Sequence, residues 1–487
     1  MNRLTSPCLS LCDILGEEYI SQILRSAELT GIDTDPKLAY KKVDFLPDSR
    51  IEQQKKLLAA VGSSVKEAWN DTEDGSPTAS FKKADNRKAA SVGGVGCMRV
   101  GEDGRLYLVG KSEHYHASLG HDFGGYKLIS YAKSLGISNA AHNNSRGYIT
   151  RLLERRLVET IGVPRLDRVI NLETGSIACE AGIKMMLARF YALDNTFAEP
   201  VYSGKTPVFL VLKGNYHGTN VVSQILRGMW GGMYKKLEEA GIVKVVELIP
   251  NDIEEFKAKL TEHNSGSFKT AGFLHELIMM NNGAIKLDKE YIRTVYKLCA
   301  ESNTPTLVDE IQTGMWYTGM FLFRLYGLKP DFVVIGKGFP GGEYPASRIV
   351  TNAKMDTLNQ FGALVTNGQE ELASLAYLIT MEYHKANAEY IGKLGDHFNA
   401  SLKAIADRYP ALITCVEGMG HCSSLQFVNV EAAADCASHL NKRCIDCSVQ
   451  LYKAECPPAL LLKPPLVADT DVLDFITDAI DEVLKNL

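Results

Sequence analysis

An aspartate and a lysine each follow a short apolar run of the sequence, and both can do chemistry at that position. Asp309 comes directly after Thr306–Val308 and is followed by a second acid, Glu310. Lys337 follows Phe332–Ile335 and enters a glycine-rich loop. A buried carboxylate needs a cation or hydrogen-bond donors, and burial lowers the pKa of a lysine so that its amine can form a Schiff base. Taken singly, Asp309 also fits a turn acid and Lys337 a surface cation.

Two further stretches place polar or aromatic residues after apolar runs. Thr174, Gly175 and Ser176 stand between a strand-like run and a helical one. Backbone N–H groups at a helix N-terminus, with hydroxyls beside them, bind phosphate well, although an ordinary helix cap has the same pattern. Tyr216, which follows another apolar run, can present its ring to a planar ligand. The adjacent His217 by itself is typical of a structural histidine.

The four stretches together supply a phosphate cradle, a ring for stacking, an acid for a ring nitrogen and an amine for an aldehyde. That set is what pyridoxal 5'-phosphate requires from a protein. Each stretch follows a strand-like run, and their joint occurrence is far more specific than any one of them. The sequence therefore predicts a pyridoxal-phosphate enzyme with Lys337 and Asp309 as its catalytic residues.

Strand-like apolar runs alternate with helical stretches from residue 168 to about residue 335. This alternation indicates an α/β fold with a mostly parallel sheet between helices, in which ligands bind at the carboxyl ends of the strands. The runs predicted as strands are Val169–Leu172, Pro207–Leu212, Val243–Leu248, Gly272–Leu274, Thr306–Val308 and Phe332–Ile335, and the predicted helices are Ile177–Tyr191, Ile253–Leu260 and Lys289–Ala300.

The chain on either side of this region has a different character. Residues 1–96 predict an N-terminal helical extension and linker, with one amphipathic helix over Ile51–Trp69. Residues 97–366 form the predicted large cofactor-binding domain. Residues 367–487 begin with a long helix over Glu370–Arg408 and continue as a smaller α+β domain.

Composition excludes several other classes of protein. The chain has 487 residues, and its formal net charge of −5 leaves no basic field for nucleic acid. No apolar run reaches the roughly 18 residues that a membrane span needs. The 11 cysteines are scattered along the chain, which favours reduced thiols and a cytoplasmic location. A metal site is not predicted, because the CxxC at Cys444 stands alone and the histidines at 114 and 116 have no third ligand.

From about residue 97 to residue 487 the chain resembles the class III aminotransferase family of fold type I pyridoxal-phosphate-dependent enzymes. The stretches that carry the resemblance are Gly101–Leu108, Leu119–His121, Thr174–Ser176, Tyr216–Gly218, Asp309–Gly314, Lys337–Gly338 with Gly341, Gly342 and Pro345, and Pro464–Leu466. The resemblance implies a large domain with a mostly parallel sheet and a smaller C-terminal domain.

The resemblance also implies roles for individual residues around the cofactor ring. Lys337 would hold the cofactor as a Schiff base, form the external aldimine with the substrate in exchange, and move the proton. Asp309 would pair with the protonated pyridine nitrogen, so that the ring accepts electrons. Gln312 would hydrogen-bond the phenolic oxygen of the ring, and Tyr216 would stack on its face.

For the phosphate, the resemblance implies that Gly175 and Ser176 bind it from one subunit. Thr366 matches a threonine that reaches the phosphate of the neighbouring subunit. The family therefore implies a homodimer with shared active sites.

The substrate side departs from the family pattern. Leu277 replaces the proline that follows Glu276 in the family motif, and Leu461 replaces the arginine that ω-aminotransferases place shortly before the Pro-Pro-Leu motif. Arg348 stands where a small residue is usual. The candidate substrate-binding residues are Tyr115, His116, Arg348 and Glu276, with His114 and Lys463 as further candidates.

Three functions remain open on these grounds. Transfer of an amino group from a small amine or amino acid to an oxo acid is favoured by the family. A racemase, epimerase or ammonia- or β-eliminating lyase is the alternative, because it needs no oxo-acid acceptor and so tolerates the missing arginine. A non-catalytic protein with this fold is disfavoured, because Lys337 and Asp309 are both present.

Overall fold

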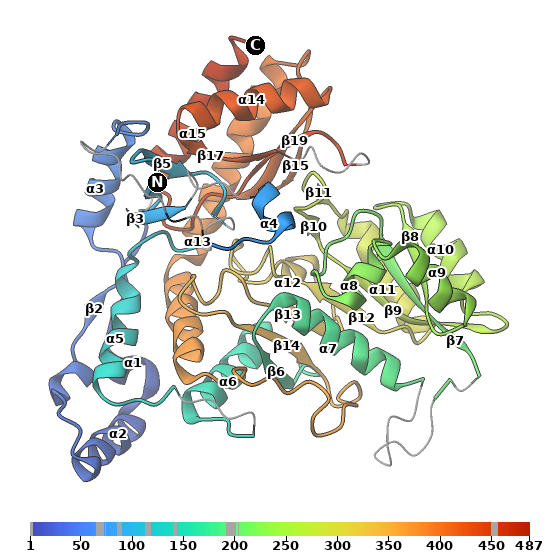
Figure 1. Cartoon of the computed structure of the whole chain (residues 1–487), viewed down its shortest axis with the longest axis horizontal. Coiled ribbons are helices and arrows are strands. Elements are labelled where there is room, and N and C mark those ends of the chain that lie inside the picture. Colours follow the sequence, from blue (N-terminus) through green and yellow to red (C-terminus); the bar gives the residue numbers. More distant parts are fainter. Residues whose placement is uncertain are drawn as a thin grey trace.

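The computed structural model describes residues 3–64, 73, 75–84, 90–112, 118–139, 144–190, 201–202, 204–449 and 456–487. The largest part of the molecule is an α/β unit, and the C-terminal sheet with its helices lies above it in Figure 1. The N-terminal helices run down one edge of the same view. These are α1 (Leu11–Leu15), α2 (Glu17–Thr30) and α3 (Asp48–Leu58).

The α/β unit is built on a seven-stranded sheet with the strand order β6-β14-β13-β12-β9-β7-β8. Every neighbouring pair is parallel except the two pairs that involve β14. The strands are β6 (Arg168–Leu172), β7 (Thr206–Leu212), β8 (Lys244–Leu248), β9 (Phe268–His275), β12 (Thr306–Asp309), β13 (Phe332–Ile335) and β14 (Ser347–Thr351). The predicted α/β class with a mostly parallel sheet is confirmed.

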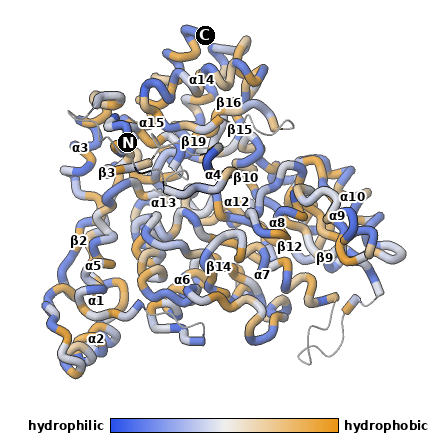
Figure 2. Tube along the Cα trace, viewed as in Figure 1, coloured by the Kyte–Doolittle hydropathy of each residue, from blue (hydrophilic) through white to orange (hydrophobic). Residues whose placement is uncertain are grey.

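Both faces of this sheet are covered, because successive side chains of each strand enter two separate hydrophobic cores. On β7, Leu210 belongs to one core, whereas Phe209 and Val211 belong to the other. The same alternation separates Val333 from Val334 on β13. Figure 2 shows the hydrophobic stretches concentrated along these central strands.

The helices between the strands lie close to their predicted positions. Helix α7 (Gly175–Ala188) packs against β13 and β14, and α10 (Ile253–Glu262) packs against β8 and α11 (Lys289–Glu301). Strand β14 was not predicted. It returns antiparallel after the loop that follows β13, so its first residue, Ser347, lies at the carboxyl ends of the parallel strands.

The C-terminal part begins with the 38-residue helix α13 (Glu371–Arg408). An antiparallel sheet of order β15-β16-β19-β18 follows, with α14 (Val430–Lys442) packed on it and α15 (Thr470–Leu484) packed against α13 and α14. Its strands are β15 (Ile413–Met419), β16 (Cys422–Phe427), β18 (Ser448–Val449) and β19 (Ala459–Leu462).

A second four-stranded sheet joins segments that are far apart in the sequence. Strands β3 (Ser91–Val95), β4 (Met98–Gly101) and β5 (Leu106–Val109) pair in order, and β17 (Ile445–Asp446) pairs with β5. This sheet therefore crosses the domain boundary that the sequence places after residue 96, and it ties the early strands to the C-terminal part.

The predicted helix over Ile51–Trp69, of which residues 65–69 lie outside the described part of the chain, ends earlier than expected. Helix α3 ends at Leu58, and Gly62 has a φ of +87°, a conformation that glycine adopts without steric cost. The N–H of Gly62 donates to the carbonyl of Leu106, so a strand partner replaces the helical hydrogen bond.

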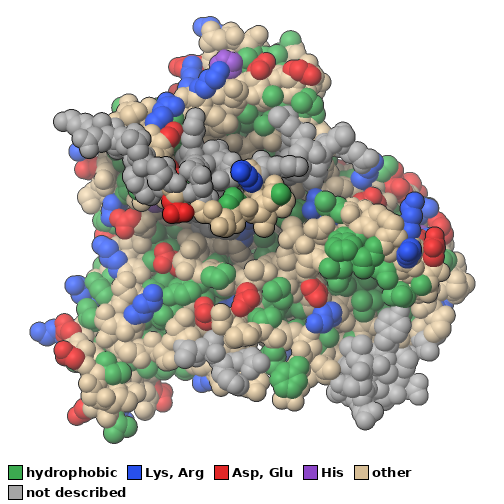
Figure 3. All heavy atoms as spheres, viewed as in Figure 1, with side chains coloured by type: hydrophobic (Ala, Val, Ile, Leu, Met, Phe, Trp, Pro, Cys, Tyr) green, Lys and Arg blue, Asp and Glu red, His purple; other side chains and the backbone are tan. Residues whose placement is uncertain are grey.

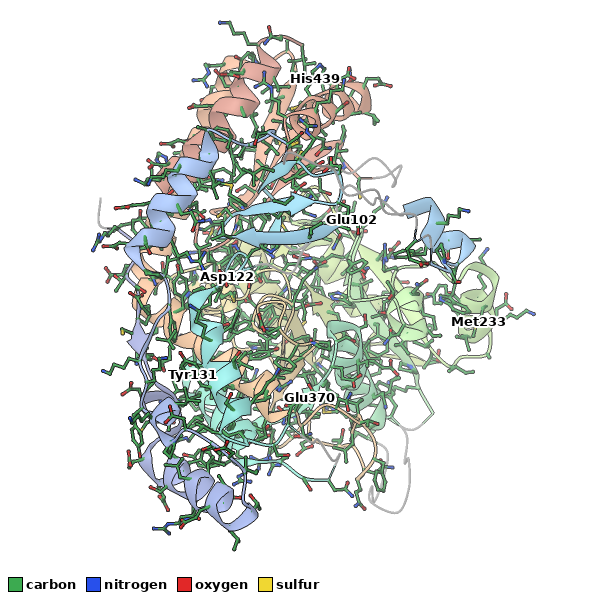
Figure 4. All side chains as sticks on the ribbon, turned by 60° about the vertical axis from the view of Figure 1, so that its left-hand side comes forward. Glu102, Asp122, Tyr131, Met233, Glu370 and His439 are labelled. Atoms are coloured by element: carbon green, nitrogen blue, oxygen red, sulfur yellow. The ribbon has the colours of Figure 1, made fainter. Side chains whose placement is uncertain are left out.

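Helix α4 (Ala79–Ala84) projects from the rest of the ribbon on the side where Met233 lies in Figure 4. Among the described residues, no helix is long and apolar enough to cross a membrane.

Candidate active site

A cavity of about 370 Å³ opens at the carboxyl ends of β6, β7, β12 and β13, where the sheet was predicted to bind its ligand. Its volume lies within the range of small-molecule sites. The residues that line it are Glu173, Thr174, Gly175, Ser176, Tyr216, His217, Gly218, Asp309, Ile311, Lys337, Pro340, Tyr344, Pro345, Ala346 and Ser347. The cavity thus brings together the four stretches singled out in the sequence.

Asp309 is the last residue of β12 and is only 5% exposed. Its Oδ1 accepts a hydrogen bond from the N–H of Ile311 at 3.0 Å. Its Oδ2 lies 2.9 Å from Nδ1 of His217 and accepts from Sγ of Cys179 at 3.4 Å. The carboxylate is therefore fixed from three elements, namely its own turn, the loop after β7, and helix α7.

His217 is a site residue that the sequence interpretation treated as structural. It is buried, and burial lowers its pKa, but the hydrogen bond to Asp309 and the carboxylate charge outweigh that effect and raise the pKa above its usual value. Its Nε2 is buried and has no hydrogen-bond partner in the described part of the chain. Only its place next to Tyr216 in the sequence could have marked it, since its partner lies 92 positions away.

The second acid, Glu310, faces the opposite direction and has a structural role. It is fully buried, its Oε1 accepts from the N–H of Phe323 at 2.7 Å, and its Oε2 accepts from the hydroxyl of Thr313. Burial raises its pKa to about 7. Adjacent residues of a strand point to opposite faces, which is why Asp309 reaches the cavity and Glu310 does not.

Lys337 lies in a closely packed loop directly after β13. Its φ of +50° is uncommon for a residue with a side chain, and such conformations cluster at functional sites. A Cβ on the next residue, Gly338, would stand 2.9 Å from the ring of Trp316. The carbonyl of Gly338 accepts from the hydroxyl of Ser118 at 2.5 Å. These contacts hold the loop so that Lys337 lines the cavity opposite helix α7.

The predicted phosphate turn is the first turn of helix α7. Thr174 is the N-cap residue, with its hydroxyl accepting from the N–H of Ile177 at 3.4 Å. The hydroxyl of Ser176 accepts from the N–H of Thr219 at 3.2 Å. Gly218 has a φ of +124°, and a Cβ there would collide with Ser176. A side chain at position 218 would therefore displace the turn that offers its N–H groups to the cavity.

Tyr216 lines the cavity from the loop after β7. The guanidinium of Arg227 lies 4.7 Å from the centre of its ring and covers one face. The N–H of Tyr216 donates to Oε2 of Glu276 at 3.0 Å. Glu276 is buried and does not line the cavity, so the structure places this predicted substrate residue behind the tyrosine, where it fixes the loop.

Arg348 does not reach the cavity, in contrast to the sequence-based expectation. The residue before it, Ser347, lines the cavity, and strand geometry directs Arg348 to the opposite face of β14. Its guanidinium is fully buried, donates to the carbonyl of Leu172 at 3.2 Å and to the hydroxyl of Ser374 at 3.1 Å, and stacks on Tyr377 at 5.1 Å. Burial lowers its pKa from the usual arginine value.

The remaining predicted residues lie in three different settings. Gln312 is buried one turn after Asp309, and its Oε1 accepts from Nζ of Lys463 at 3.0 Å. Thr366 is exposed on the surface and does not line the cavity of its own chain. His114, Tyr115 and His116 lie outside the described residues.

The residues that line the cavity fit pyridoxal phosphate. Helix α7 directs free N–H groups toward it beside a glycine where a side chain would collide, as a phosphate site requires. Lys337 offers the amine, Asp309 offers a carboxylate already fixed by donors, and Tyr216 offers an aromatic face. These groups would hold the phosphate, the aldehyde carbon, the ring nitrogen and the ring plane respectively.

Comparison with known proteins assigns the chain to a family. The sequence profile described as aminotransferase class-III matches residues 81–484, so the chain belongs to the class III aminotransferase family. The predicted family, the pyridoxal-phosphate cofactor and the assignment as an aminotransferase are thereby confirmed.

Individual relatives are distant in sequence. The chain is 25% identical to acetylornithine aminotransferase of Nostoc sp. over 442 residues, which are 87% of this chain and 98% of the relative. Adenosylmethionine-8-amino-7-oxononanoate aminotransferase from Methanocaldococcus jannaschii superposes with a TM-score of 0.69 at 21% identity, covering 90% of this chain and 99% of the other. A phospholyase from Arthrobacter shares the fold with a TM-score of 0.66 at 18% identity, covering 82% and 94%.

Replacing His217 with phenylalanine should weaken the site without disturbing the fold elsewhere. The ring volume is retained, but the Asp309 carboxylate loses a buried hydrogen bond, and a hydrogen bond to a charged group contributes about 1.5–3 kcal/mol. We expect kcat/KM to fall roughly 10- to 100-fold, and cofactor binding to weaken. Steady-state kinetics and a cofactor titration followed by absorbance measure both quantities.

The matched control is His421→Phe, which removes another fully buried histidine whose Nε2 bonds the carbonyl of Ile391 in the C-terminal part. It should lower the unfolding temperature but leave cofactor affinity unchanged. If both variants lose affinity equally, the role assigned to His217 is wrong.

Proposed function

We propose that Lys337 and Asp309 are the catalytic residues with which this aminotransferase moves an amino group from a small amine or amino acid to an oxo acid. The observation that carries the proposal is that both line one cavity. They follow the neighbouring parallel strands β13 and β12, whose register pairs Asp309 with Val334. A lysine amine and a carboxylate that follow adjacent strands at one sheet edge can serve the two ends of a single planar cofactor.

When bound, the cofactor supplies an aldehyde for the amine and a ring that accepts electrons from the substrate. Asp309 holds a negative charge where the ring nitrogen would be protonated, and His217 and the N–H of Ile311 keep the carboxylate oriented. Lys337 provides Nζ as the group that takes a proton from the substrate carbon and returns it. Gly175 and Ser176 anchor the phosphate, and Tyr216 orients the ring.

A second candidate reaction rests on one residue. Leu461 occupies the position of the family arginine before Pro464, and it is 1% exposed within strand β19. An apolar, buried side chain there provides no cation for the carboxylate of an oxo acid. A racemase or lyase needs no such acceptor, and the Arthrobacter phospholyase shows that this fold also carries elimination chemistry. The family still favours transamination.

We further propose a homodimer with shared active sites. Thr366 is exposed, as a residue that serves another subunit would be. Figure 3 shows hydrophobic side chains gathered on the face that carries α8 (Val221–Leu226) and α9 (Gly231–Glu239). The exposed residues there are Val221, Met229, Trp230 and Met233. A second copy of the chain is the partner we propose for this surface.

All 11 cysteines are free thiols, which supports the predicted cytoplasmic location.

The role of Lys337 predicts a spectroscopic change. Purified enzyme with cofactor should be yellow from the Schiff base, and Lys337→Ala should abolish that band while leaving the unfolding temperature nearly unchanged. Absorbance spectra before and after addition of cofactor measure this. The control Lys354→Ala removes an exposed lysine outside the cavity and should stay yellow. A wild-type protein that remains colourless with added cofactor would contradict the proposed site.

Transamination and its alternatives differ in what happens without an oxo acid. An aminotransferase should convert the bound cofactor stoichiometrically into its amine form and then stop until an oxo acid is added. We expect one equivalent of product per active site, measured by absorbance and product analysis. Continued turnover without an oxo acid, with release of ammonia or an inverted product, would instead establish the racemase or lyase reaction.

The shared-site proposal predicts recovery of activity in hybrid dimers. Lys337→Ala and Thr366→Glu should each be inactive or nearly so, the second because its charge repels the phosphate. When the two variants are unfolded and refolded together, hybrid dimers should contain one site with both defects and one intact site. Activity should then recover to about a quarter of the wild-type value. No recovery would mean that both residues serve the site of the same chain.

A further inference from the structure

Lys463 is a buried cation behind the active site, at the point where strand β19 leaves the C-terminal sheet. Its side chain and backbone together are only 1% exposed. Its N–H donates to the carbonyl of Gly110 at 2.8 Å, and its carbonyl accepts from the N–H of Ser112 at 2.8 Å. The backbone is thus fixed in both directions, and the side chain starts from a rigid position.

The ammonium group of Lys463 contacts the side-chain amide of Gln312. Its Nζ donates to Oε1 of Gln312 at 3.0 Å and lies 4.0 Å from the centre of the Trp316 ring. An ammonium group has donors only, so the amide oxygen of Gln312 must face it and the NH₂ group must face away. Among the residues that the structure describes, we find no acceptor for that NH₂ group. The orientation of this amide is therefore set by chemistry.

We propose that Lys463 is a positioning residue that locks Gln312 as a hydrogen-bond donor toward the phenolic oxygen of the cofactor. The inference rests on the proposed function and on the role that the family resemblance implies for Gln312, which is to hydrogen-bond that oxygen. A donor stabilises the oxygen in its anionic form, and this form accompanies the deprotonated Schiff base of Lys337. Lys463 thereby lowers the pH at which the Schiff base loses its proton.

The burial of Lys463 favours a role in positioning Gln312 over a role in binding the substrate. Lys463 does not line the cavity, and Trp316 lies between it and the catalytic loop, in close contact with Gly338. The neighbouring cation is Lys111, which pairs in register with Lys463 and is also buried. Neither lysine is among the described residues that line the cavity.

The test is a pH titration of the yellow band of the holoenzyme. In Lys463→Met the amide of Gln312 is free to turn over, so the Schiff base should lose its proton at a pH higher by about one unit. Lys463→Arg keeps a pure donor and should titrate close to the wild type. Lys111→Met serves as the matched control, because it removes the neighbouring buried cation and leaves both Lys463 and Gln312 in place, and it should titrate like the wild type.

A second variant tests the proposal independently if Lys463→Met does not fold. Gln312→Glu keeps an acceptor for Lys463 but has no N–H to donate, so its titration should also move to higher pH. In the double variant Gln312→Glu with Lys463→Arg, the arginine change should add almost nothing to the shift. If Lys463 acts through Gln312, the effects of Lys463→Met and Gln312→Ala should likewise fail to add.

Three results would overturn the proposal. The first is an unchanged titration in both Lys463→Met and Gln312→Glu. The second is an equal shift in Lys111→Met, which would reduce the effect to local charge. The third is a rise in KM for the substrate with no spectral change, which would make Lys463 a substrate-binding residue. The proposed function survives each of these results, because it is tested by the yellow band of the wild type and its loss in Lys337→Ala.

Discussion

The buried carboxylate of Asp309 is the group on which the arrangement of this site depends. At the end of a strand that is covered on both faces, an unsatisfied carboxylate would cost several kcal/mol. Donors from helix α7, from the loop after β7 and from its own turn satisfy it. The same three elements carry the phosphate turn, Tyr216 and Gln312. Satisfying one buried charge therefore assembles the groups that the cofactor needs.

Two cations that the sequence suggested for the substrate, Arg348 and Lys463, are both buried and both contact aromatic rings. Each replaces hydration with hydrogen bonds to neutral acceptors. Arg348 ties β14 to β6 and α13, whereas Lys463 ties the C-terminal sheet to the turn that follows Asp309. Residue type alone indicated a cation near the site, whereas the structure shows that each cation is buried and hydrogen-bonded to neighbouring protein groups.

The sequence of this enzyme says more about how it binds the cofactor than about how it binds the substrate. The cofactor is rigid and polar at defined points, so a protein that binds it must offer matching groups at defined positions. The substrate side differs by single changes such as Leu461, and the same fold serves aminotransferases and a phospholyase. Reaction type therefore depends on a few side chains around a shared framework of fixed groups.

The sequence by itself determined the fold class and the cofactor, and it predicted which residues would bind that cofactor, because strand and helix periodicity and the turn residues after each strand are local signals. It missed β14, the early end of α3 at Leu58 and the pairing of β17 with β5, since each depends on a partner distant in the chain. Only the tertiary structure decided that His217 supports Asp309, that Glu310 faces away, and that Arg348 and Lys463 are buried. The direction in which a side chain points and the partner it meets are set by packing between segments that are remote in the sequence.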